Sequence, residues 1–164
     1  MTEQNLCTVS LQALASGSLD VWTGLSPDCT RQTAEEVFGE SEMTQDSVGF
    51  LNGSPTGYRA FPALPAAPSG ILVWFVEDQI VLIRIQEPKL PPLESLLGKP
   101  EATAPSQLHA FHTQWIYATR GLTAHVQNQT GKVAWLFTYP PMTAAAFLAS
   151  WISRVSTTRI PNRR

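Results

Sequence analysis

The amino-acid sequence repeats one order of features twice. A helix-like segment that runs into a glycine occurs as EEVFG at 35–39 and again as ESLLG at 94–98. A second glycine then opens an apolar run, SGILVWFV at 69–76 and RGLTAHVQ at 120–127. A short polar turn, another apolar run and a proline complete each copy. Internal repetition of this kind predicts two copies of one supersecondary unit that pack against each other.

Local patterns predict the elements of each copy. Short runs of Val and Ile on either side of Glu77-Asp78 predict a β-hairpin over 71–85, and 121–139 reads as a second hairpin. Gly39 and Gly98 are well placed to end the two helices. The remaining expected elements are strands over 6–14 and 108–119, helices over 93–97 and 144–155 with Thr143 as the cap, and a long loop or irregular short strands over 44–70.

These elements predict an α+β fold. We expect two tandem helix plus antiparallel-sheet units that pack as one domain and are followed by a C-terminal helix. Residues 1–88 would form the first unit, with an N-terminal segment and the long Pro/Gly loop. Residues 89–164 would form the second unit together with the C-terminal helix.

The predicted turns pair Phe75 with Ile80 and Val126 with Val133, and strict alternation from these pairs assigns the side chains to two faces. One face is almost wholly apolar and is expected under the helices: Ile71, Val73, Phe75, Ile80, Leu82, Leu122, Ala124, Val126, Val133, Trp135 and Phe137, with Arg84 at its end. The other face is mixed: Leu72, Trp74, Val81, Ile83, Ile85, Thr123, His125, Ala134, Leu136 and Thr138.

The mixed face is the candidate recognition surface. A sheet with helices on one side leaves its second face open, and contiguous exposed apolar surface often forms a partner or ligand site. The candidate binding residues are Trp74, Ile83, His125 and Leu136, with Tyr117 and Arg120 towards the rim. The alternative is that the N-terminal segment or the 44–70 loop covers this face.

Composition narrows the classes of partner and the compartment. The charged fraction is 15%, below the usual value of about 25%, and the net charge of −2 offers no electrostatic footprint for nucleic acid. The longest apolar run is too short to span a membrane. The N-terminus lacks the basic region of a signal peptide. We therefore expect Cys7 and Cys29 to be free thiols in a bacterial cytoplasmic protein.

The sequence offers little support for catalysis. His109 and His112 are three residues apart, but on a strand they would point to opposite faces, so no metal site is expected. His125 could act as an acid or base, yet no carboxylate or nucleophile is placed to work with it. Arg84 is interpreted as an arginine that extends from a strand end to solvent. No cofactor motif is found.

One resemblance accompanies these patterns. The stretch LESLLGKPEA, followed by WIYATRGLTAHV and a second strand, resembles the unit of beta-lactamase inhibitor proteins. The resemblance implies two tandem helix-plus-antiparallel-sheet repeats with a concave sheet face that grips a protein. None of that family's binding residues can be placed on this sequence, so it implies no target.

The leading functional hypothesis is a non-catalytic protein-binding module, such as an inhibitor, immunity protein or adaptor, that acts through the mixed sheet face. The alternative is a small enzyme, of the cyclase or isomerase type, with an aromatic-lined pocket around Trp74 and His125. A self-associating homodimer is a third reading, and the mixed face is also compatible with a small-molecule ligand. The two main hypotheses differ in shape, because a binder should have a broad shallow surface and an enzyme a deep cavity with a buried polar cluster.

Overall fold

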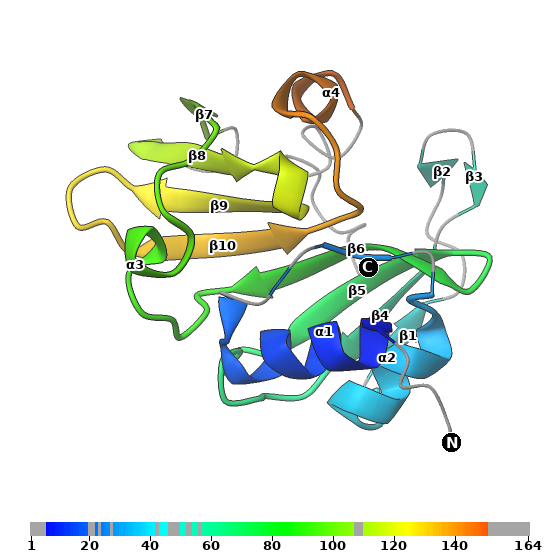
Figure 1. Ribbon diagram of the computed structural model, residues 1–164. Helices are drawn as coiled ribbons and strands as arrows, with labels where there is room; N and C mark the ends of the chain where they lie inside the picture. The colour runs from blue at the N-terminus through cyan, green and yellow to red at the C-terminus, as the bar shows by residue number, and fades with distance from the viewer. Residues whose placement is uncertain are drawn as a thin grey trace.

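The computed structural model describes residues 6–19, 22, 24–26, 28–41, 43–45, 50–51, 54–55, 57–106 and 110–150. Helices and strands follow one another along the chain as Figure 1 shows. The helices are α1 (Leu6–Ser16), α2 (Arg31–Phe38), α3 (Leu93–Leu97), the 3-10 turn η2 (Ala118–Arg120) and α4 (Ala144–Ala149). The strands are β1 (Met43–Gln45), β2 (Phe50–Leu51), β3 (Ser54–Pro55), β4 (Gly57–Phe61), β5 (Ile71–Val76), β6 (Gln79–Gln86), β7 (Ala102–Pro105), β8 (His112–Tyr117), β9 (Leu122–Gln127) and β10 (Val133–Thr138).

Eight of these strands form one antiparallel sheet in the order β1-β4-β5-β6-β10-β9-β8-β7. The first four strands come from one half of the chain and the last four from the other, and the second half runs in the reverse order. Each half follows a short helix that ends at a glycine, Gly39 after α2 and Gly98 after α3. The predicted α+β fold is therefore confirmed: two tandem helix-plus-sheet units share one sheet, and helix α4 follows them (Figure 1).

The two units join through β6 and β10, which lie at the centre of the sheet. Ile83 pairs with Thr138, and Leu136 pairs with Ile85. Ile83 of the first unit corresponds to Leu136 of the second, and Ile85 corresponds to Thr138. Each of the two pairs is therefore the equivalent of the other. The midpoint is the pair Arg84 and Phe137. The joint therefore has an approximate two-fold relationship, as expected when two copies of one motif share a sheet.

Each hairpin contains one extra residue at the same place in its second strand. In the first unit Phe75 pairs with Ile80 but Trp74 pairs with Leu82, so Val81 is unpaired in the ladder. In the second unit Val126 pairs with Val133 but His125 pairs with Trp135, so Ala134 is the extra residue. A bulge of one residue moves every later side chain to the opposite face. The predicted turn pairs were correct, and the strict alternation beyond them was wrong.

The bulges redistribute the side chains between two apolar clusters. The helix-side core joins α1, α2 and α3 to one sheet face, and it includes Ile83, Ile85 and Leu136. The far-side cluster, on the opposite face, contains Leu82 and Phe137 with Trp135 packed against it. Its full buried membership is Tyr58, Trp74, Leu82, Ile116, Ala118, Phe137, Tyr139 and Phe147. Phe147 belongs to α4, so α4 covers part of the far side of the sheet.

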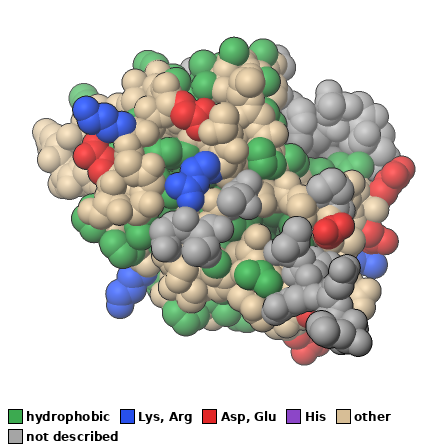
Figure 2. Space-filling model, in the orientation of Figure 1, with side chains coloured by type: hydrophobic (Ala, Val, Ile, Leu, Met, Phe, Trp, Pro, Cys, Tyr) green, Lys and Arg blue, Asp and Glu red, His purple; other side chains and the backbone are tan. Residues whose placement is uncertain are grey.

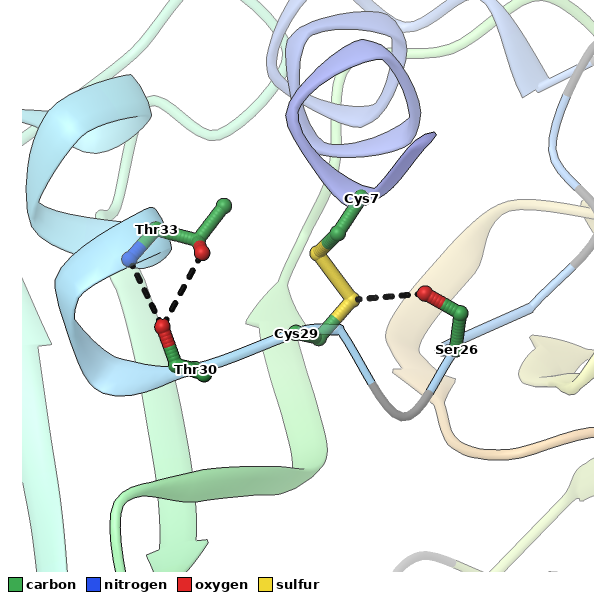
Figure 3. Close-up of a disulfide and its surroundings, with 5 residues drawn as sticks. All are labelled: Cys7, Ser26, Cys29, Thr30 and Thr33. Carbon is green, nitrogen blue, oxygen red and sulfur yellow. Dashed lines mark hydrogen bonds between the residues drawn. A yellow bond between two sulfur atoms is a disulfide. The ribbon is translucent and has the colours of Figure 1, made fainter. Parts of the chain in front are cut away.

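The N-terminal segment predicted as a strand over 6–14 is helix α1. Cys7, Leu11 and Leu14 lie at i, i+4 and i+7, and all three are buried on one helical face. Cys7 is bonded to Cys29 with an S–S distance of 2.04 Å, so the predicted free thiols were also wrong. The bond ties the start of α1 to the segment that leads into α2, where Thr30 caps the helix (Figure 3).

The C-terminal helix begins where the sequence predicts. The Thr143 side chain accepts a hydrogen bond from the Ala146 N–H and caps α4, which is described as far as Ala149. Ser150 is extended and ends α4, so the helix is shorter than the predicted 144–155; residues 151–155 lie outside the described residues. None of the helices in the described part of the chain has the length and apolar content needed to cross a membrane.

Candidate functional site

The six predicted binding residues do not form one surface. Trp74 and His125 lie on the far side of the sheet, whereas Ile83 and Leu136 point into the helix-side core. Trp74 is 8% exposed and the other three are at most 1% exposed. The structure therefore corrects the prediction of one exposed mixed face. The bulges at Val81 and Ala134 leave Trp74 and His125 on one side of the sheet and place Ile83 and Leu136 on the other.

His125 takes part in a buried polar row on the far side. Its Nδ1 lies 2.7 Å from the Ser106 hydroxyl, which follows β7, and its ring packs edge-on to Phe137 at 5.3 Å. The hydroxyl of Thr123, on the same strand as His125, lies 2.7 Å from the hydroxyl of Tyr139, which follows β10. Burial raises the pKa of the Tyr139 hydroxyl, and this effect outweighs the hydrogen bond to Thr123, which lowers it. Tyr139 also stacks on Phe147 of α4, with the ring centres 4.9 Å apart, so these contacts hold both side chains in place.

Tyr117 and Arg120 contact backbone carbonyls inside the molecule. The Tyr117 hydroxyl donates to the Gly98 carbonyl at 2.9 Å, and burial together with the Glu94 carboxylate raises the pKa of Tyr117 to about 12. The Arg120 Nε donates to the Trp22 carbonyl at 3.2 Å, which fixes the N-terminal segment to η2. These hydrogen bonds hold Tyr117 against the glycine that ends α3 and Arg120 against the N-terminal segment.

Of the two histidines that are three residues apart, the structure describes only His112. The Nδ1 of His112 contacts the Ala110 carbonyl at 2.9 Å, and His109 lies outside the described residues. Within the described ranges, no three His, Cys, Asp or Glu side chains lie together as metal ligands would.

Arg84, on the far side of the sheet, lies between two tryptophan rings. Its guanidinium carbon lies 5.2 Å from the centre of the Trp74 ring and 4.6 Å from that of Trp135. The ion pairs between described residues, Arg31–Asp78 and Arg59–Glu35, do not involve it. Burial lowers the pKa of Arg84 to about 10. A partly dehydrated guanidinium is thus held by two aromatic rings and faces no carboxylate of the described chain.

A hollow of about 220 Å³ opens beside Arg84 and the half-buried Trp135. The exposed side chains of Ser69 and Gln86 also line it and can donate hydrogen bonds. Its remaining lining residues are Ala60, Phe61, Gly70, Ile71 and Leu72.

Gly70 is required at the wall of this hollow. It has a φ of +87°, and a Cβ there would lie 2.6 Å from the Phe61 carbonyl oxygen.

The Arg84 site can bind a carboxylate. A guanidinium presents its N–H donors in a planar fork that matches two carboxylate oxygens, and stacking on aromatic rings keeps that fork oriented. We refer to Arg84, Trp74, Trp135, Gln86 and Ser69 as the arginine site. Arg84 was interpreted from the sequence as a strand-end residue. The sequence feature that could have identified this site is a charged residue inside QIVLIRIQ, with apolar neighbours on both sides.

Charged side chains are also present on the face of the molecule that carries α1, α2 and α3. Figure 2 shows acidic and basic side chains scattered over this face, without a broad patch of one sign among the described residues. The view offers no continuous basic track of the kind that follows a nucleic-acid backbone.

No protein-family model and no curated protein matches the sequence. Among solved structures, a DUF4309 family protein (YjgB) from Bacillus subtilis subsp. subtilis str. 168 is 14% identical, with 82% of this chain and 95% of that chain covered and a TM-score of 0.39. An extracellular protein containing a SCP domain from Bacillus anthracis str. Ames is 9% identical, with 90% of this chain covered and a TM-score of 0.42. This chain spans 50% of the length of the latter. Both TM-scores are below 0.5, and neither likeness indicates a function for this chain.

Proposed function

We propose that the chain is a non-catalytic protein-binding module that holds a carboxylate of its partner at the arginine site. The observation that carries this proposal is Arg84, stacked between Trp74 and Trp135 without a carboxylate from the described chain. A charge that has lost water without gaining a counter-ion is unfavourable, and a partner's carboxylate would compensate that cost. Binding energy would then be concentrated in one arginine and two tryptophans, the residue types that dominate interface hot spots.

The size of the hollow favours a protein partner. Sites for whole small molecules usually enclose about 300–1,000 Å³, whereas the hollow beside Arg84 measures about 220 Å³. That volume suits one acidic side chain or a C-terminal carboxylate. The half-buried Leu72, Ala60 and Trp135 next to it can pack against apolar groups of the same partner.

An inhibitor, an immunity protein and an adaptor would all use such a surface. The alternative of a small enzyme centred on His125 receives less support. His125 is completely buried, and its Nδ1 is already engaged by Ser106. A general base must be within reach of the proton it removes from a substrate.

The disulfide bears on the compartment in which this binding would occur. A cytoplasmic location stays a prediction of the sequence. Disulfides persist mainly in oxidising compartments and are rare in the cytosol. We therefore propose that binding takes place in an oxidising compartment, which the Cys7–Cys29 bond supports.

Selection from a random peptide library displayed with free and with blocked C-termini tests the proposal. The wild-type chain should select peptides that carry Asp, Glu or a free C-terminal carboxylate, and Arg84→Gln should weaken their binding at least about 30-fold, or about 2 kcal/mol. Arg31→Gln is the matched control, because Arg31 also stacks on an aromatic ring, Phe75, but is paired with Asp78. Selected peptides without a common carboxylate, or equal binding by Arg84→Gln, would refute the proposal. Capture of a second copy of the chain alone would favour self-association instead.

A further inference from the structure

A second and larger hollow lies on the opposite side of the sheet, in the second unit. It measures about 610 Å³ and is bounded by the segment that joins β6 to α3 and by the turn between β9 and β10. In Figure 1 these two segments flank α3 at the left of the molecule. The volume is within the range of about 300–1,000 Å³ that is typical of small-molecule sites.

The floor of this hollow is aromatic and apolar. Trp115, on β8, is half-buried and packs against the helix-side core together with Leu90 and Val133. Trp115 pairs across the sheet with the small residue Ala124. Because Trp115 lines the hollow and is only half-buried, a flat ring can lie against its indole.

The two walls are held in place by the backbone. Pro88, Pro91 and Pro92 restrict one wall, and the Lys89 N–H in the same segment donates to the Ala66 carbonyl at 2.9 Å. On the other wall the Lys132 N–H donates to the Thr130 hydroxyl at 3.2 Å. A site whose walls are fixed before binding loses less entropy when a ligand arrives.

Positively charged side chains outnumber negatively charged ones at the hollow. Lys89 and Lys132 both line it, and neither forms an ion pair with another described residue. Glu94, from the first turn of α3, also lines the hollow and can accept a hydrogen bond from a ring N–H. Two lysines beside an aromatic floor, without an ion-pair partner among the described residues, complement an anionic group attached to a flat ring.

We propose that this hollow is a binding site for a small aromatic anion. The ring would lie on Trp115, and a carboxylate or phosphate group would lie between Lys89 and Lys132. This site is independent of the arginine site, because it lies on the other face of the sheet and involves none of the same residues.

Titration of the ¹⁵N-labelled chain with indole-3-acetate and with tryptamine distinguishes the contribution of the ligand's charge to binding from that of its ring. The two probes share the indole ring and carry opposite charges. Indole-3-acetate should shift the Trp115 indole and Gly131 amide signals, and tryptamine should bind at least tenfold more weakly. Phenyl phosphate provides a second arm that compares a phosphate with a carboxylate. Binding should weaken as salt is added.

Variants locate the site. The double substitution Lys89→Gln/Lys132→Gln should weaken indole-3-acetate binding at least tenfold, whereas Lys99→Gln, at an exposed lysine outside the hollow, should leave it unchanged. Trp115→Leu should abolish binding, and if that variant does not fold, the lysine variants decide. Equal affinity for the acid and the amine, or an equal loss in Lys99→Gln, would overturn the proposal.

Discussion

Arg84 lies directly opposite Phe137 where β6 meets β10, and each residue occupies the position that the other occupies in its own unit. At this central pair the first unit supplies a cation and the second unit supplies a ring. One row away, Leu82 of the first unit corresponds to Trp135 of the second, which stacks on Arg84. The two units therefore share a backbone plan but differ in chemistry at their joint, and that difference creates the arginine site.

Replacing Arg84 should affect binding far more than folding. Arg84→Met loses two cation–π contacts, each worth about 0.5–2 kcal/mol, but it also removes a partly dehydrated charge that has no ion pair among the described residues. We expect the free energy of unfolding to change by no more than about 1 kcal/mol, because these effects oppose each other. Urea denaturation of both proteins measures it. A loss above about 3 kcal/mol would show that Arg84 is a structural residue.

The bulge in β6 predicts different costs for two substitutions that strict alternation would treat alike. Val81 and Ile83 are two residues apart, and a regular strand would place them on one face. Ile83 is fully buried in the helix-side core, so Ile83→Ala should cost about 2–5 kcal/mol. Val81 is the extra residue and is half-buried, so Val81→Ala should cost about 1 kcal/mol or less. Equal costs in thermal or urea unfolding would contradict the observed register.

The repeat was visible in the sequence because its signals are local. Gly39 and Gly98 end the two helices as predicted, and Glu77 and Asp78 form the two-residue turn with positive φ values of 49° and 72°. The bulges were not visible because both strand faces are largely apolar. A valine or an alanine at the bulged position fits either face, so the hydrophobic pattern contains no sign of the extra residue.

The disulfide and the arginine site depend on contacts between distant segments. Cys7 and Cys29 are 22 residues apart, and their approach requires α1 to be a helix that packs beside α2. Partial alternation in LCTVSLQAL favoured a strand instead. Arg84 gains its second tryptophan only because β10 pairs with β6, an arrangement that short sequence windows cannot report.

Alkaline pH should destabilise the fold partly through Tyr117. Its pKa is about 12 in the folded chain and about 10 when unfolded, so the folded state holds this proton more tightly. The resulting stability is fully present below pH 10 and is lost as the pH rises towards 12. Tyr117→Phe lacks the hydrogen bond to Gly98 and should be about 1 kcal/mol less stable at pH 7. Its unfolding free energy should fall less steeply than that of the wild type between pH 10 and 12; parallel curves would contradict this assignment.

Reduction of the disulfide should lower stability without unfolding the chain. The Cys7–Cys29 bond closes a loop with a sequence separation of 22, and the restriction it places on the unfolded chain is worth about 3 kcal/mol. Leu11 and Leu14 still anchor α1 in the helix-side core after reduction, so the protein should remain folded with a lower melting temperature. The double substitution Cys7→Ala/Cys29→Ala should melt near the temperature of the reduced wild type and should not respond to reductant. Intact mass should rise by two hydrogens when the wild type is reduced. An unchanged mass, or the same melting temperature with and without reductant, would show that the two cysteines are not bonded in solution.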